Sequence, residues 1–148
     1  MNNYMQIAVK EAKSGIKNSH GGPFGAVIVK NNKIISKAHN TVLKDQDPTC
    51  HAEMNAIRSA AKKLKTFNLK DCEIYTTSEP CPMCSAAIQW ARIKNVYFGC
   101  TVKDAHAIGF DDLTFSQSSN KNIGRSLDRQ ECLKVMDEWK KKKDKKMY

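Results

Sequence analysis

The sequence lacks long hydrophobic runs: within its 148 residues, no apolar stretch approaches the roughly 18 residues that a membrane-spanning helix requires. The first residues also lack a basic segment followed by an apolar one, which is the pattern of a secretory signal. Internal repeats and low-complexity linkers are absent, and the composition changes only at the basic end of the chain. We therefore expect a cytoplasmic protein with no membrane partner. It should form a single domain over residues 1–148, with a basic C-terminal helix and tail over residues 126–148.

The charge balance is strongly positive but unevenly distributed. Hydrophobic residues make up 41% and charged residues 27% of the chain, as in ordinary globular proteins. The net charge is +10, and residues 140–146 alone carry six lysines and one aspartate, a net +5. Lysine runs of this kind are usually solvated helix ends or tails. The charge therefore favours a small-molecule partner over nucleic acid.

Six cysteines in a cytosolic chain of this length do not predict a disulfide scaffold. Cys81 and Cys84 form a C-x-x-C pair, and the other four are scattered singly. Taken alone, the pair fits either a redox dithiol or one corner of a structural zinc site.

Hydrophobic patterns predict alternating strands and helices. Helical spacing or a proline-led start predicts helices at residues 2–18, 51–65, 80–92 and 126–143. Short apolar runs predict strands at residues 24–30, 33–39, 72–77 and 95–99. Asn31 and Asn32 supply a tight turn between the first two strands, because asparagine tolerates positive φ. Residues 40–50 appear irregular and residues 100–124 carry no clear pattern. The alternation predicts an α/β fold in which helices cover a sheet and ligands bind at the strand ends.

Two motifs stand at predicted helix starts, H-A-E at residues 51–53 and P-C-P-M-C at residues 80–84. Cysteines three apart share one helix face, and a helix N-terminus favours their thiolate form. His51 would add a nitrogen ligand, giving three zinc ligands together with Cys81 and Cys84. Structural zinc sites close with four protein ligands, whereas catalytic sites leave one position for water. Cys50 is the residue that could close the site and make it structural.

Glu53 lies beside these ligands and is not needed to hold the metal. A carboxylate in that position can carry a proton from an activated water to the substrate. The pattern therefore predicts hydrolytic chemistry with Glu53 as a catalytic residue.

H-A-E followed by P-C-x-x-C is the signature of zinc-dependent nucleobase deaminases. Longer segments carry a closer resemblance: residues 21–29 (GGPFGAVIV), 47–53 (DPTCHAE), 79–84 (EPCPMC) and 109–112 (GFDD). On these segments residues 1–115 resemble the guanine deaminase family of the cytidine deaminase superfamily, and the terminal Tyr148 is similar to that family's ending.

The resemblance implies a three-layer α/β/α fold with a central mixed sheet of about five strands and helices on both faces. It implies one Zn²⁺ per chain on His51, Cys81 and Cys84, with Glu53 as the proton shuttle and a purine base as substrate. Further residues would contact or select that base: Asn40, Phe24, Ala52, Asp112 and Tyr148. It also implies a homodimer in which the C-terminal segment, with Tyr148, can cross into the partner's site.

Four of these residues have structural alternatives. Asn40 could stabilise a loop, Phe24 could be plain core, Asp112 could cap a helix, and Tyr148 could be a disordered end. The stretch between Asp112 and the last helix is shorter and more polar than in that family, so a fifth strand has no predicted position.

The sequence leaves four functions open. Guanine hydrolysis to xanthine and ammonia is the leading hypothesis. A transfer-RNA adenosine deaminase would share both motifs and use the basic tail, and a cytosine deaminase would use the same chemistry. A zinc-stabilised binding module would carry out no reaction at all.

Overall fold

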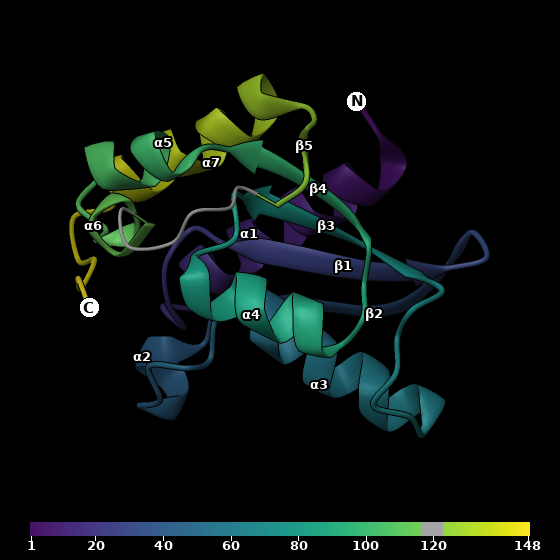
Figure 1. The fold of residues 1–148 in the computed structure, drawn as a ribbon. Helices are drawn as coiled ribbons and strands as arrows, with labels where there is room; N and C mark the ends of the chain where they lie inside the picture. Colours follow the sequence, from purple (N-terminus) through teal and green to yellow (C-terminus); the bar gives the residue numbers. More distant parts are fainter. Residues whose placement is uncertain (117–122) are drawn as a thin grey trace.

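The computed structural model describes residues 1–116 and 123–148, and its centre is a five-stranded mixed sheet (Figure 1). The strands are β1 (Gly25–Lys30), β2 (Lys33–His39), β3 (Cys72–Ser78), β4 (Asn95–Cys100) and β5 (Arg125–Ser126). Their order in the sheet is β2-β1-β3-β4-β5. β1 runs antiparallel to β2 and β3, while β3, β4 and β5 are parallel.

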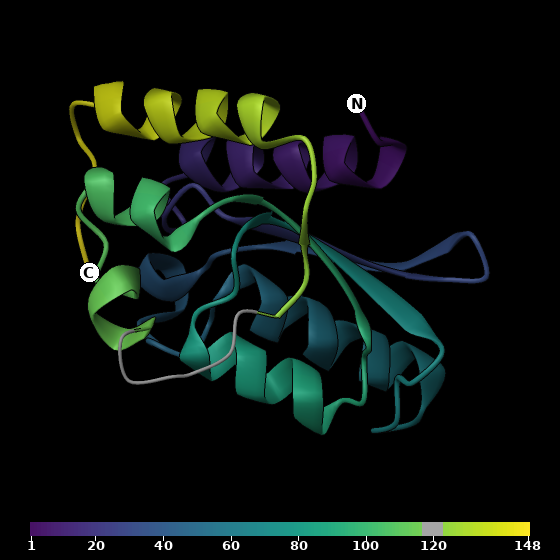
Figure 2. The ribbon, with the colours of Figure 1, turned by 45° about the horizontal axis from the view of Figure 1, so that its top comes forward.

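Helices cover both faces of this sheet. In Figure 2, α1 (Asn3–Lys17) and α7 (Arg129–Lys141) lie on one face, and α3 (Ala52–Leu64) and α4 (Pro82–Trp90) lie on the other. Side chains of β1 alternate between two hydrophobic clusters: Val27 and Val29 pack toward α1 and α7, and Ala26 and Ile28 toward α3 and α4. Burial on both faces explains the continuous apolar run in this strand. The expected three-layer α/β/α fold with a mixed sheet is confirmed.

Most predicted elements occur within two residues of their expected ends. Asn31 and Asn32 adopt φ values of 49° and 60°, as expected for the turn that joins β1 to β2. The irregular stretch before α3 contains one short helix, α2 (Val42–Asp45). The predicted helix at residues 126–143 begins later, as α7, because Ser126 belongs to β5 and pairs with Phe98 of β4.

The region without a clear pattern contains α5 (Val102–Ala107) and α6 (Asp112–Ser116), and residues 117–122 lie outside the described part of the chain. None of the helices in the described residues combines the length and hydropathy needed to cross a membrane.

Candidate active site

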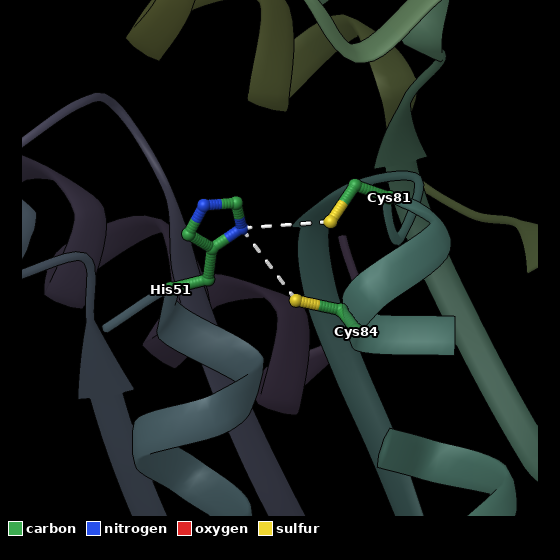
Figure 3. A group of neighbouring side chains, drawn as sticks. All are labelled: His51, Cys81 and Cys84. Atoms are coloured by element: carbon green, nitrogen blue, oxygen red, sulfur yellow. Dashed lines mark hydrogen bonds between the residues drawn. The ribbon is translucent and has the colours of Figure 1, made fainter. Parts of the chain in front are cut away.

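The two sequence motifs meet where α3 and α4 begin, on the same face of the sheet. His51 is the N-cap of α3 and Cys81 is the N-cap of α4, with Cys84 in the first turn of α4. Figure 3 shows the imidazole of His51 facing the two sulfurs. Its Nδ1 lies 3.6 Å from the Sγ of Cys81 and 3.6 Å from the Sγ of Cys84.

This spacing fits a tetrahedral zinc ion. Bonds of about 2.0 Å to nitrogen and 2.3 Å to sulfur place a nitrogen and a sulfur ligand about 3.5 Å apart. Among the described residues, only His51, Cys81 and Cys84 bring three ligand atoms within 4.8 Å of one another. The candidate donor set is therefore one nitrogen and two sulfurs.

Cys50 does not join this group. Its sulfur lies 3.8 Å from Nη1 of Arg58, and it is not part of the group of three ligand atoms. The alternative in which Cys50 closes a four-ligand structural site therefore has no geometric support among the described residues.

The local charges favour metal binding. A hydrogen bond from the Cys84 thiol is the largest influence on Cys81 and, with the interaction with His51, lowers the pKa of Cys81 to about 4 despite burial. Cys81 is thus a thiolate at neutral pH, which is the form that binds metal. The second thiol would lose its proton when the ion binds.

Glu53 lies in the first turn of α3 and only 6% of its side chain surface is exposed. Burial and then the neighbouring Cys81 thiolate raise its pKa to about 7. A carboxyl group with a pKa near neutrality can both accept and release a proton at neutral pH.

A cavity of about 250 Å³ opens beside these residues. Aromatic side chains form much of its wall: Phe24, Phe110, Phe115 and Tyr148. Carboxylates form the polar part: Glu53, Glu79, Asp111 and Asp112. The ring centroids of Phe24 and Phe110 are 4.9 Å apart in an edge-to-face arrangement, and those of Phe110 and Tyr148 are 5.3 Å apart. Such a site suits a flat ring with hydrogen-bond donors on its edge.

Of the five residues that the resemblance implies would contact or select the base, three line this cavity: Phe24, Asp112 and Tyr148. Asp112 is the first residue of α6, and burial followed by the Cys81 thiolate raises its pKa to about 6. The hydroxyl of Tyr148 accepts a hydrogen bond of 3.2 Å from the backbone N–H of Gly22 in the same chain. Tyr148 therefore contributes to the cavity of its own chain.

Asn40 and Ala52 are placed differently. Asn40 is 1% exposed at the end of β2, and its Oδ1 accepts a hydrogen bond from the N–H of Val42. Its Nδ2 makes no hydrogen bond of ordinary length and angle among residues 1–116 and 123–148, although the Asn40 side chain lies close enough to the Tyr148 hydroxyl to act on the pKa of that group as a donor. The side chain of Ala52 is fully buried in the hydrophobic cluster under α3, so a substrate contact from this residue would involve its backbone.

Several residues of the cavity wall had no predicted role: Pro48, Ser78, Glu79, Phe110, Asp111 and Phe115. Ser78 is notable because its hydroxyl is buried without a partner in the described part of the chain. Its position at the end of β3, three residues before Cys81, is the signal that could have identified it. Glu79 accepts a hydrogen bond from the N–H of Val102, which ties the cavity wall to the start of α5.

This fold, with a His-Cys-Cys group and a buried glutamate beside a cavity, defines the class of metal-dependent hydrolytic deaminases. Residues 1–100 match the cytidine and deoxycytidylate deaminase zinc-binding region. The chain belongs to this family.

Individual relatives give a more detailed comparison. A guanine deaminase of Bacillus subtilis is 50% identical over 109 residues, which cover 74% of this chain and 70% of that protein. A tRNA-specific adenosine deaminase of Aquifex aeolicus is 47% identical over 100 residues, covering 68% of this chain and 66% of that protein.

Among solved structures, the X-ray structure of guanine deaminase from Bacillus subtilis has a TM-score of 0.76 at 41% identity. It covers 100% of this chain and 99% of that chain. A structure from a study of A-to-I editing by tRNA:A34 deaminases has a TM-score of 0.73 at 31% identity, covering 89% and 97%. The predictions of the fold, the superfamily and a hydrolytic deaminase are confirmed by these matches.

Proposed function

We propose that this chain hydrolyses guanine to xanthine and ammonia. The observation that carries the proposal is the single cavity in which His51, Cys81 and Glu53 meet acidic and aromatic walls. The similarity to a guanine deaminase over most of the chain supports the same substrate.

One zinc ion per chain would be held by His51, Cys81 and Cys84. When bound, it supplies a Lewis acid that lowers the pKa of water at an open coordination position. Glu53 would carry one proton from that water to the ring nitrogen as the C–O bond forms. It would then carry a second proton, from the hydroxyl group added to the ring carbon, to the amine as the C–N bond breaks and ammonia leaves. Its pKa of about 7 suits a group that must both accept and release a proton during one turnover.

The acidic side chains of the cavity wall would favour guanine over adenine through the pattern of hydrogen-bond donors on the base. Guanine presents N–H donors at N1 and at its 2-amino group, whereas adenine presents an acceptor at N1. Carboxylates such as Asp112 and Glu79 accept hydrogen bonds when ionised, so they match the guanine edge. Phe24 would contact the face of the purine, and the unpaired Nδ2 of Asn40 would donate to an acceptor on the base. Ala52 would contribute through its backbone.

A tRNA adenosine deaminase is the second candidate. The similarity to tRNA-specific adenosine deaminases and the lysine-rich tail favour it. Against it, Tyr148 lies in the cavity, where a nucleotide of tRNA would need room for its ribose and phosphates. Cytosine deamination and a binding module without chemistry are the remaining alternatives, and one experiment separates all four functions.

The experiment is ammonia release from guanine, adenine, cytosine, their nucleosides and a tRNA anticodon stem, using the zinc-loaded full chain. We expect turnover of free guanine and little of the others. Turnover restricted to the folded RNA would overturn the guanine assignment, and release from cytosine alone would replace the substrate. No release from any compound would favour the binding module.

The quaternary structure is part of this proposal. We expect a homodimer. Exchange of the C-terminal segment between its two chains is a separate expectation, because Tyr148 can reach the cavity of its own chain and a dimer does not require the exchange. Light scattering would give the mass, and mixing a Glu53→Gln chain with a Tyr148→Ala chain would test exchange. Exchanged tails would restore activity in the mixture, whereas tails that stay on their own chain would not.

We also propose that residues 1–148 form a single domain and that the protein acts in the cytoplasm. All six cysteines are free thiols in the structure, and this suits a reducing compartment.

A further inference from the structure

Four side chains outside the cavity form a continuous chain of polar contacts. Nζ of Lys37 lies 3.2 Å from Oε1 of Glu11, whose Oε2 lies 3.1 Å from Nδ1 of His39. Nε2 of His39 lies 2.8 Å from Nδ1 of His20, and the two imidazole rings are stacked with centroids 5.1 Å apart. These residues come from α1, from β2 and from the turn that follows α1.

The contacts fix where the protons lie. An ionised carboxylate only accepts hydrogen bonds, so Nδ1 of His39 must carry a proton toward Glu11. In the neutral ring Nε2 is then bare, and it accepts a hydrogen bond from Nδ1–H of His20. The facing nitrogens share one proton when the pair is neutral or singly charged. They repel when both rings are protonated.

Charged groups from three elements surround the pair. Glu11 on α1 and Asp45 on α2 are acidic, whereas Lys37 on β2 and Lys44 on α2 are basic. Burial, then His39 and then Lys44 lower the pKa of His20 below its usual value. The neutral form of His20 is therefore favoured, and the contact is lost only as the pH falls below that lowered pKa.

The histidine pair joins two backbone segments next to the cavity. His20 precedes Gly21 and Gly22, and the N–H of Gly22 donates to the Tyr148 hydroxyl. His39 precedes Asn40. The segments touch directly, since a Cβ on Gly21 would collide with the Asn40 side chain.

We infer that Glu11, His39 and His20 act as positioning residues that hold Asn40 and Gly22 in place for purine binding. This inference rests on the proposed function, because it assumes that Asn40 contacts the base. None of the three lines the cavity, so their effect is on substrate affinity and not on the chemical step.

The test compares His39→Leu with His39→Gln in the zinc-loaded full chain. Leucine removes both hydrogen bonds of His39, so Asn40 and Gly22 are held less firmly, and KM for guanine should rise by about five-fold with kcat within two-fold. Glutamine can accept from His20 and donate to Glu11, so it should restore KM at neutral pH. As the pH falls below the lowered pKa of His20, KM should rise more steeply in the wild type than in His39→Gln, whose uncharged amide oxygen accepts a hydrogen bond from either form of His20.

Lys13→Gln is the matched control. It removes a surface ion pair of 2.7 Å between Lys13 on the same helix and Glu138 of α7, and it should change neither KM nor its pH profile. Nitrogen-15 NMR of the histidine rings adds a readout without activity: His39 should be protonated at Nδ1 and bare at Nε2 at neutral pH.

A wild-type KM in His39→Leu, or the opposite His39 tautomer, would overturn the positioning role alone. A loss of kcat in proportion to unfolding would also overturn it, as a purely structural effect. A wild-type protein that turns over no purine base would instead overturn the proposed function.

Discussion

The unpaired amide nitrogen of Asn40 gives the sharpest quantitative prediction. Asn40→Ala removes Nδ2, which has no partner among the described residues, and Oδ1, which accepts from Val42 at 3.1 Å. A buried donor without a partner destabilises the fold by about 1–3 kcal/mol, so removing Nδ2 should stabilise the variant. Losing the hydrogen bond from Val42 should destabilise it by a similar amount. The melting temperature should therefore change by no more than about 3 °C.

The effect on turnover should be larger. If the base supplies the acceptor for Nδ2, its binding regains about 1–3 kcal/mol, so Asn40→Ala should lower kcat/KM for guanine by about 5- to 150-fold. Ammonia release under steady-state conditions measures this ratio, and calorimetry measures the melting temperature.

Thr77→Val is the matched control because it removes a buried polar group that has a hydrogen-bond partner and lies outside the cavity. The Thr77 hydroxyl accepts a buried hydrogen bond of 3.0 Å from the N–H of Gly25, and Thr77 does not line the cavity. Its loss should lower the melting temperature by about 3–10 °C and leave kcat/KM of the folded enzyme unchanged. Wild-type kcat/KM in Asn40→Ala, or an equal loss in Thr77→Val, would refute the reasoning.

Further predictions concern the metal and the cavity. Glu53→Gln should keep the wild-type zinc content and lose ammonia release, because the amide cannot carry the proton; retained turnover would remove Glu53 from the mechanism. Cys84→Ser should lose zinc, and a chelator should lower the melting temperature of the wild type but not of this variant, since a ligand at a thousandfold excess over its Kd stabilises by about 4 kcal/mol. Asp112→Ala should reduce guanine turnover with zinc content unchanged, and wild-type rates would show a structural role. Ser78→Ala should keep or raise the melting temperature, because its hydroxyl has no partner in residues 1–116 and 123–148, and a marked drop would contradict this geometry.

The sequence predicted four of the five strands and the grouping of His51, Cys81 and Cys84 as candidate metal ligands, because both depend largely on local patterns. The apolar run of β1 and the two asparagines of the turn define a hairpin without knowledge of the rest of the fold. C-x-x-C at a helix start fixes the relative positions of two ligands within one turn. Only the approach of His51 to the two cysteines depends on tertiary structure. The combination of H-A-E with P-C-x-x-C predicted that approach.

The rest of the site depends on contacts between distant segments. β5 has two residues and pairs with β4 across a long connection, so no periodicity could reveal it. Phe110 lines the cavity because it packs against Phe24, Trp139 and Tyr148, which come from distant parts of the chain, and its neighbours in sequence do not indicate this. The contact between His20 and His39 joins residues 19 positions apart, and no sequence motif predicts it.

The most direct test of the central claim measures metal and activity in the same samples. Elemental analysis of the purified chain, of Glu53→Gln and of Cys84→Ser would be paired with ammonia release from guanine. Our account predicts about one zinc per chain in the first two, with turnover in the wild type alone, and neither zinc nor turnover in Cys84→Ser. A wild-type chain that releases ammonia from guanine without tightly bound metal would contradict it.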